Sequence, residues 1–172
     1  STDNTENVIS NYIYNPKIKF YRNEQNIGLV ANWNKCLGLA KGEYIKFLCS
    51  DDKFHPNIIK KYVDILDENP DVVLVSCKKE WFGKGIDPKV IGVPFTGKIS
   101  GERAILHLVI NDNYLGEPSL PIFRKSALSV GGFNTSYSYI VDWEMWIRIL
   151  SMGHCFIIPE VLCYTRKHLQ RQ

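Results

Sequence analysis

The sequence predicts one α/β domain. Short apolar segments with the composition of strands, such as residues 44–48 and 72–75, alternate with longer segments whose apolar residues recur at helical steps. The first of these strands is followed closely by two adjacent carboxylates, Asp51 and Asp52. Ligands of open α/β sheets collect at the carboxyl ends of strands, so this pair marks the expected functional edge. A length of 172 residues and a hydrophobic content of 45% suit a single domain spanning residues 1–172.

The first half of the chain is expected to contain an N-terminal loop, a short helix and then regular elements. Alternating apolar residues predict a strand over residues 17–21. The helical spacing of apolar residues predicts a helix over 29–40, before the strand at 44–48, and another over 56–66. The first of these helices should bury one stripe, which comprises Leu29, Trp33, Cys36, Leu37 and Ala40.

The second half continues the alternation around a long gap. Residues 72–75 have the continuous apolar character of a strand covered on both faces. Repeated Gly and Pro predict an irregular loop over residues 78–98, and loops of that length are usually functional or mobile. The remaining predicted elements are a helix over 100–110, a strand over 120–123, a helix over 142–152 and a last strand over 155–158.

Composition limits the class of protein. A net charge of +3 is too small to indicate nucleic-acid binding, and no apolar run reaches transmembrane length. No N-terminal segment has the pattern of a secretion signal. Five scattered cysteines without a Cys-x-x-Cys pair indicate reduced thiols in a cytoplasmic protein, without a disulfide framework or a structural zinc. The basic tail from Arg166 to Arg171 is either a solvated end or a point of peripheral contact with anionic lipid.

Two acidic positions carry alternative interpretations. Hard carboxylate oxygens at Asp51 and Asp52 suit Mg²⁺ or Mn²⁺ that holds a phosphorylated substrate. Alternatively, one of these residues only caps the helix that Pro56 opens. Asp142 begins a later amphipathic helix, where it is either a general base in a cleft or a helix cap favoured by the dipole. The residues alone leave both choices open.

Five segments, in order and at about the spacing of that family, resemble the family 2 glycosyltransferases, which have the GT-A fold and use nucleotide-sugars. They are Asn26-x-Gly28, Gly42-Glu43-Tyr44-Ile45, Ser50-Asp51-Asp52, Gly131-Gly132-Phe133 and Asp142-Trp143-Glu144-x-Trp146-x-x-Arg148. The resemblance covers nearly the whole chain. It implies a GT-A-like mixed sheet flanked by helices, in a transferase that builds a surface polysaccharide or glycolipid.

The resemblance also implies roles for single residues. Asp51 is the expected direct ligand of Mg²⁺ or Mn²⁺, Asp52 assists by orientation or through water, and His168 lies beside the metal and the diphosphate. Asp142 is the expected general base, and direct displacement with a single base inverts the anomeric centre. The expected donor is a UDP-sugar, and the acceptor is a saccharide or a lipid-linked saccharide.

Other binding residues follow from the same resemblance. The donor is expected at Asn26, Gly28, Asn34 and Asp51, and the acceptor at Glu117 and Glu144. Two positions depart from the family pattern. Cys49 stands where the first Asp of an Asp-x-Asp motif is usual, and a thiol is a poor ligand for Mg²⁺. Trp33 stands where many relatives carry Arg, which weakens the case for a diphosphate-contacting cation there.

The opening strands of the family have no counterpart in this sequence, whose first residues resemble the loop that follows them. In the family those strands form the floor of the nucleotide site. We therefore expect this chain, taken alone, to bind UDP or GDP weakly, to be inactive and to self-associate through an open sheet edge. A sugar nucleotidyltransferase and a nucleotide-sugar-binding module without turnover are the alternative functions.

Overall fold

In the computed structural model, which describes residues 3–168, seven strands form one sheet. They are β1 (Tyr44–Lys46), β2 (Lys53–Phe54), β3 (Val72–Phe82), β4 (Lys89–Ile91), β5 (Gly97–Ile99), β6 (Ile122–Arg124) and β7 (His154–Arg166). The strand order is β1-β6-β3-β7-β2, with β4 beside β3 and β5 beside β7. The long strands β3 and β7 are parallel, and the other pairings among these strands are antiparallel. The predicted mixed sheet is therefore present.

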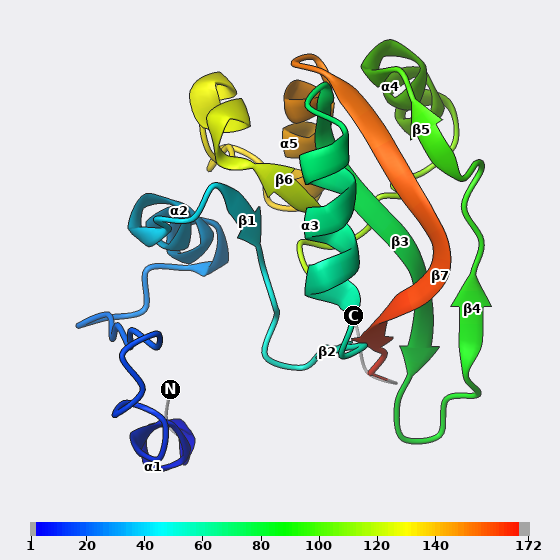
Figure 1. The fold of residues 1–172 in the computed structure, drawn as a ribbon. Helices are drawn as coiled ribbons and strands as arrows, with labels where there is room; N and C mark the ends of the chain where they lie inside the picture. Colours follow the sequence, from blue (N-terminus) through cyan, green and yellow to red (C-terminus); the bar gives the residue numbers. More distant parts are fainter. Residues whose placement is uncertain (1–2, 169–172) are drawn as a thin grey trace.

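Helices cover both faces of the sheet (Figure 1). They are α1 (Thr5–Ser10), α2 (Leu29–Leu39), α3 (Ile58–Glu68), α4 (Gly101–Ile110) and α5 (Val141–Leu150), together with the 3₁₀-helix η1 (Lys125–Val130). On one face α3 packs Tyr62 and Leu66, both fully buried, against the sheet. On the other face α2, α4 and α5 share a second core in which Trp146 is the largest fully buried side chain. In Figure 1, α1 lies away from the sheet, and it buries no side chain.

The helix predictions are confirmed. The helices expected at 29–40, 56–66, 100–110 and 142–152 are present, and each end lies within two residues of its predicted position. The N-terminus of α4 shows why a sequence signal can place a helix end. The Ser100 Oγ accepts a hydrogen bond from the backbone N–H of Arg103, as an N-cap serine does.

The predicted strand at residues 17–21 is wrong. Within the described residues no strand pairs with this segment, and Ile18, Phe20 and Tyr21 are exposed. Alternating apolar residues favour an extended backbone, but a strand also needs a neighbour that accepts and donates its hydrogen bonds.

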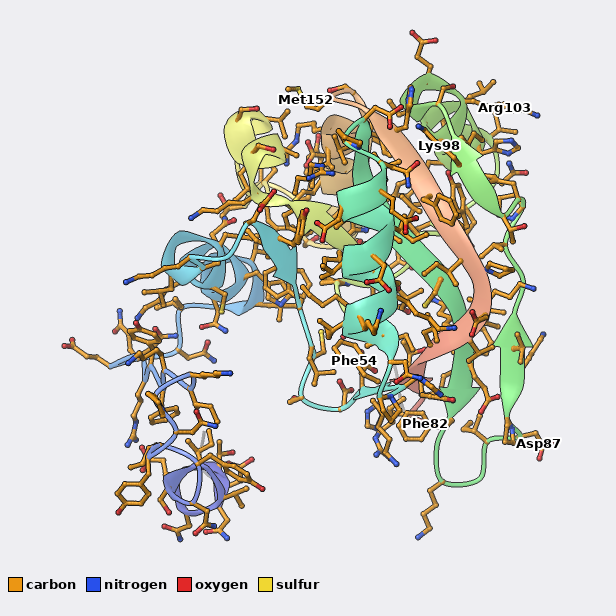
Figure 2. All side chains as sticks on the ribbon, viewed as in Figure 1. Phe54, Phe82, Asp87, Lys98, Arg103 and Met152 are labelled. Atoms are coloured by element: carbon orange, nitrogen blue, oxygen red, sulfur yellow. The ribbon has the colours of Figure 1, made fainter. Side chains whose placement is uncertain are left out.

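The predicted loop at residues 78–98 is also wrong in part. Strand β3 continues to Phe82, a hairpin leads to β4, and β5 follows. Figure 2 labels Phe82 at the end of β3 and Asp87 near the hairpin turn. The last strand is likewise longer than the predicted 155–158. The added part of β3 carries half-exposed side chains, several of them polar, and the added part of β7 mixes exposed polar residues with the buried Leu162 and Cys163. The apolar pattern is therefore interrupted while the backbone pairing of β3 with β7 and β4 continues.

The stripe predicted to be buried on α2 is confirmed in part, since Trp33 and Ala40 are partly buried and pack against the core. Leu37 is buried, whereas Cys36 is exposed and Leu29 is 63% exposed. All five cysteines are free thiols, of which Cys77, Cys155 and Cys163 are buried. Within residues 3–168 no helix combines the length and the apolar character needed to cross a membrane.

Candidate functional site

A cavity of about 910 Å³ lies between α2, the segment that follows β1, and the end of β7. Its wall includes residues 47–52, Glu117, Asp142 and residues 165–168. Asp51 and Asp142 are distant in the sequence, yet both line this one cavity, as the sequence predicted. The face of α2 that we expected to be buried, with Leu29 and Cys36, lines it too, which explains its exposure.

Backbone contacts fix the segment that carries Asp51. The Cys49 N–H donates to the Ser119 Oγ at 2.9 Å. The Arg166 N–H donates to the Asp52 Oδ1 at 3.0 Å, and the Arg166 Nε donates to the Asp51 carbonyl at 3.2 Å. Asp52 therefore ties this segment to β7. The Asp51 side chain remains available, and its Oδ2 lies 3.2 Å from the His168 Nε2.

Asp51 and His168 fit a divalent cation that arrives with a phosphorylated ligand. Their side chains are 37% and 50% exposed, so both are open to solvent. The described residues contain no cluster of three or more His, Cys, Asp or Glu side chains that could hold a metal ion. Mg²⁺ commonly takes only one or two carboxylates and completes its shell with substrate phosphates and water. Burial raises the pKa of the Cys49 thiol, which keeps it protonated and unsuited to bind a cation at neutral pH.

Asp142 lies in the first turn of α5, where its Oδ1 accepts the Trp143 N–H at 2.8 Å. Burial raises the pKa of Asp142, and the negative charge of Glu117 raises it further. The hydrogen bond from Trp143 and the positive charge of Lys79 act in the opposite direction. A carboxylate with a raised pKa is a stronger base, so the setting of Asp142 suits proton abstraction.

Glu117 lies in the cavity wall, where the sequence prediction placed an acceptor contact. Its Oε2 is 2.7 Å from the Nζ of Lys79, whose side chain is only 12% exposed. This ion pair joins the loop before β6 to the second half of β3. The negative charge of Glu117 also raises the pKa of Asp142, so Glu117 interacts with both Lys79 of β3 and Asp142.

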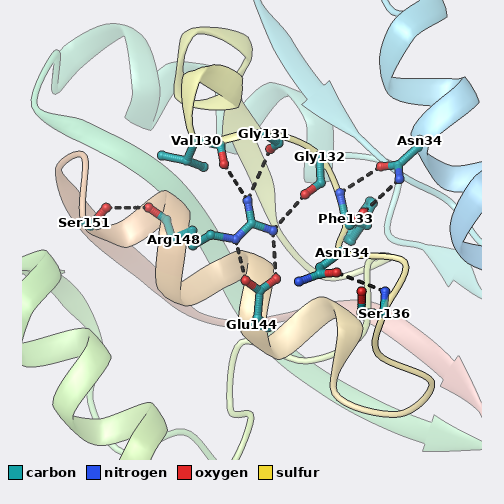
Figure 3. Close-up of polar contacts among 10 residues, drawn as sticks. All are labelled: Asn34, Val130, Gly131, Gly132, Phe133, Asn134, Ser136, Glu144, Arg148 and Ser151. Carbon is teal, nitrogen blue, oxygen red and sulfur yellow. Dashed lines mark hydrogen bonds and ion pairs between the residues drawn. The ribbon is translucent and has the colours of Figure 1, made fainter.

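Glu144, a predicted acceptor residue, does not line this cavity. Figure 3 shows its polar contacts. Its Oε2 lies 2.7 Å from the Arg148 Nη2. The same guanidinium donates to the carbonyls of Val130, at 2.8 Å, and Gly132, at 2.7 Å. Side chains two positions apart on a helix point to different sides, so Asp142 faces the cavity while Glu144 holds Arg148.

Asn34, a predicted donor residue, is also engaged in structure (Figure 3). Its Nδ2 donates to the Phe133 carbonyl and its Oδ1 accepts the Phe133 N–H, both at 2.8 Å. A Cβ at Gly132 would lie 2.5 Å from the Asn34 Oδ1, so only glycine fits there. The Phe133 ring packs on Trp33 at 5.1 Å between centroids. The Gly-Gly-Phe segment is thus explained by packing against α2.

Asn26 and Gly28 line a neighbouring cavity of about 650 Å³, which shares Leu29 and Asn32 with the first. The Asn26 Oδ1 accepts the Gly28 N–H at 2.9 Å, and Gly28 has a φ of +82° directly before α2. This pair forms the turn that starts α2, because glycine adopts positive φ without strain. The structure brings the pair beside the Asp51 cavity, not into it.

Sequence reasoning missed several residues of the cavity wall, namely Trp81, Thr165, Arg166 and Lys167 as site residues. Trp81 fell in the predicted loop, Arg166 and Lys167 fell in the predicted tail, and Thr165 lies directly before that tail. It also missed Lys46, which donates to the carbonyls of Phe47 and Ser119 behind the wall. Burial lowers the pKa of Lys46 to about 8. The sequence signal that could have identified Lys46 is a charged residue inside the predicted strand at 44–48.

The first 129 residues match the model of the family "Glycosyl transferase family 2". The chain belongs to this glycosyltransferase family. An uncharacterized glycosyltransferase of Rickettsia typhi is 31% identical over 180 residues, which cover 98% of this chain and 52% of that protein. This family 2 chain spans about half the length of the curated relatives it matches.

Solved glycosyltransferase structures have a similar fold. TarS of S. aureus, in complex with UDP-GlcNAc, superposes with a TM-score of 0.74 at 20% identity, over 99% of this chain and 48% of TarS. A mannosyltransferase of Pyrobaculum calidifontis, in complex with GDP-Man and Mn²⁺, superposes with a TM-score of 0.66 at 17% identity, over 99% of this chain and 46% of that enzyme. The predicted GT-A-like fold class is confirmed.

Proposed function

We propose that the protein transfers a sugar from a nucleotide-diphosphate donor to a saccharide or lipid-linked acceptor. The observation that carries the proposal is the shared cavity, which has Asp51 with His168 and also Asp142 in its wall. The likeness to TarS with UDP-GlcNAc and to a mannosyltransferase with GDP-Man and Mn²⁺ supports a nucleotide-sugar donor and a divalent cation. The donor we favour is a UDP-sugar.

The proposed reaction is a direct displacement that inverts the anomeric centre. The acceptor oxygen bonds to the anomeric carbon as the bond from that carbon to the diphosphate breaks. Asp142 accepts the proton of the attacking hydroxyl, a role for which its raised pKa suits it. Asp51 and His168 would hold Mg²⁺ or Mn²⁺, which neutralises charge on the departing diphosphate when bound. Asp52 supports Asp51 by fixing its loop to β7.

We infer the cellular location from the proposed product. We propose that the protein acts in the cytoplasm, with peripheral contact at the inner face of the membrane, in the synthesis of a surface polysaccharide or glycolipid. Exposed cationic side chains near the end of β7 are compatible with such a contact, because anionic lipids attract them.

Substitution of Asp142 tests the proposal. In a full-length version of the protein, Asp142→Asn keeps the shape of the side chain but removes the base, so transfer or donor hydrolysis should fall by at least about 100-fold. Asp64→Asn, on the exposed face of α3, is the matched control and should retain activity. Unchanged turnover in Asp142→Asn would refute the proposed base. Release of pyrophosphate from UTP and a sugar 1-phosphate would instead identify a nucleotidyltransferase.

A further inference from the structure

Part of the cavity wall takes no part in the mechanism proposed above. Trp81 on β3 lies in register with Lys89 on β4 and with Thr165 on β7, so the three residues form a strip across neighbouring strands. Figure 1 shows these strands side by side. The Nζ of Lys167 lies 3.4 Å from a ring centroid of the Trp81 indole. The Nζ of Lys89 lies 5.9 Å from a ring centroid of the same indole. Trp81, Thr165 and Lys167 all line the cavity that holds Asp51.

Thr165 carries an unused polar group at one end of this strip. The residue is only 5% exposed, and its Oγ1 has no hydrogen-bond partner among the described residues. Buried hydroxyl groups in folded proteins nearly always have a partner, because an unsatisfied one costs free energy. A hydroxyl in this state on a cavity wall indicates a group that a bound ligand would satisfy.

The two lysines near the Trp81 ring, Lys89 in the strip and Lys167 beside it, carry uncompensated charge. Among the described residues, neither Lys89 nor Lys167 takes part in an ion pair. The position of Lys167 is fixed by its backbone, since its N–H donates to the Phe82 carbonyl at 2.8 Å. The chain passes closely there: a Cβ on Gly83 would lie 2.3 Å from the Lys167 carbonyl oxygen. The backbone of Lys167 is therefore fixed at the end of the sheet, and its ammonium group lies above Trp81.

We propose that Trp81, Thr165, Lys89 and Lys167 form the acceptor subsite, and that the acceptor is an anionic saccharide bearing a phosphate or a carboxylate. This inference rests on the proposed function. The part of the Trp81 indole that Lys167 does not cover supplies an apolar contact for a sugar ring. The Thr165 hydroxyl bonds to a sugar hydroxyl, and the two ammonium groups bind the anionic substituent through charge-assisted hydrogen bonds.

The subsite adjoins the proposed base. Lys79 is two residues before Trp81 on the same face of β3, and it pairs with Glu117 at 2.7 Å. Glu117 in turn lies close enough for its charge to act on Asp142. A saccharide seated on Trp81 can therefore extend along Lys79 and Glu117 and present a hydroxyl to Asp142 in the same cavity.

An NMR titration of the 172-residue chain tests the subsite and detects weak binding. The probes are glucose 6-phosphate, glucuronate and neutral glucose, and the signal is the indole N–H of Trp81, assigned with Trp81→Phe. One or both anionic sugars should shift this signal with an affinity at least about fivefold above that of glucose. The two anionic probes separate a phosphate-bearing acceptor from a carboxylate-bearing one.

Two variants locate the binding groups. Thr165→Val and Lys167→Gln should each weaken binding of the anionic sugar by at least about fivefold. Thr165→Val removes a hydroxyl without a partner and keeps the side-chain shape, so its melting temperature should be unchanged or higher. This separates lost binding from lost folding. Lys84→Gln, in the hairpin between β3 and β4, is the matched control and should bind as the parent chain does.

Each other outcome counts against the inference. Equal binding of glucose and the anionic sugars, or full binding by Thr165→Val and Lys167→Gln, would overturn it. If these variants weaken binding of UDP with Mn²⁺ and leave the anionic sugars unaffected, the strip serves the donor and the inference is wrong, while the proposed function stands. Unchanged binding of UDP with Mn²⁺ in Asp51→Asn would count against the proposed function, independently of the sugar titration.

Discussion

Cys49 and Asp51 lie two residues apart in one segment, yet their environments give them different chemistry. The thiol of Cys49 is half-buried with a raised pKa, and its backbone N–H is bonded to Ser119. The carboxylate of Asp51 is partly exposed and lies beside His168. A hard cation prefers the oxygen ligand, so we assign cation binding to Asp51.

Substitutions at these two positions should therefore differ in effect. Asp51→Ala should reduce metal-dependent transfer by at least about 100-fold, since even the loss of an outer-shell partner typically costs 10–100-fold. Cys49→Ser should retain most activity, because the backbone N–H that bonds to Ser119 is kept. Initial rates over a series of Mn²⁺ concentrations measure both effects. Equal damage by the two substitutions would show that position 49 binds the cation.

The charges around Asp142 predict a pH effect with a definite sign. Asp142 acts as a base only when ionised, so the rate should rise with pH through its pKa. Glu117→Gln removes a negative charge that raises this pKa, so the acid limb should move to lower pH. Lys79→Met removes a positive charge that lowers the pKa, so the limb should move to higher pH. Profiles of kcat/KM against pH measure both shifts, and shifts in the same direction would contradict the assignment of the base.

At the scale of elements, α5 contributes one side chain to the cavity wall and holds a loop with others. Asp142 in its first turn faces the cavity, whereas Glu144 and Arg148 hold the loop of residues 130–132. Trp146 of the same helix is fully buried, and its Nε1 donates to the Gly116 carbonyl at 2.9 Å. The position of the proposed base therefore depends on contacts made by the rest of the helix.

The contact between α2 and the Gly-Gly-Phe segment gives a stability prediction. Asn34→Ala leaves the N–H and the carbonyl of Phe133 without their partner, which should lower the free energy of unfolding by about 1–3 kcal/mol. Asn32→Ala, on the exposed side of the same helix, should change it by no more than about 0.5 kcal/mol. Urea unfolding measures both. A stable Asn34→Ala variant with weakened donor binding would restore the role in donor binding that the sequence suggested.

At the scale of the whole molecule, the sheet ends at an open strand. In the described part of the chain, β1 pairs with β6 on one side and with no strand on the other. Exposed apolar side chains accompany the N-terminal segment before α2, among them Ile18 and Phe20. Unpaired edges and exposed apolar surface favour association with another chain.

We therefore predict that the 172-residue chain self-associates. Light scattering should show a mass that rises with concentration above that of the 19.8 kDa monomer. The double substitution Ile18→Lys and Phe20→Lys should shift the chain toward monomer, because it places charge on exposed apolar surface that would otherwise favour association. Ile59→Lys, at an exposed position of α3, is the control and should leave association unchanged. A monomer at all concentrations would show that this edge is not adhesive.

Most of the fold could be predicted from the sequence, because the apolar residues of the helices are periodic and the first half of the central strand is continuously apolar. The sequence could not extend β3 to Phe82, because only the pairing partners of that polar half make it a strand. Asp51 and Asp142 were identified through the family resemblance, since their positions alone left a helix cap as the alternative. The engagement of Asn34 and Glu144 depends on Phe133 and Arg148, and contacts of this kind leave no pattern in a single sequence. Thr165 escaped notice for the same reason.

The exposed thiol of Cys36 offers a chemical handle. Of the five cysteines, all within the described residues, Cys155, Cys163 and Cys77 are buried and Cys49 is half-buried, whereas Cys36 is exposed and lines the cavity. Thiol-reactive dyes attack accessible thiolates, so a maleimide fluorophore should label Cys36 first in the folded chain. The dye would then report occupancy of the cavity by a change in its emission, in the protein with its own sequence unaltered.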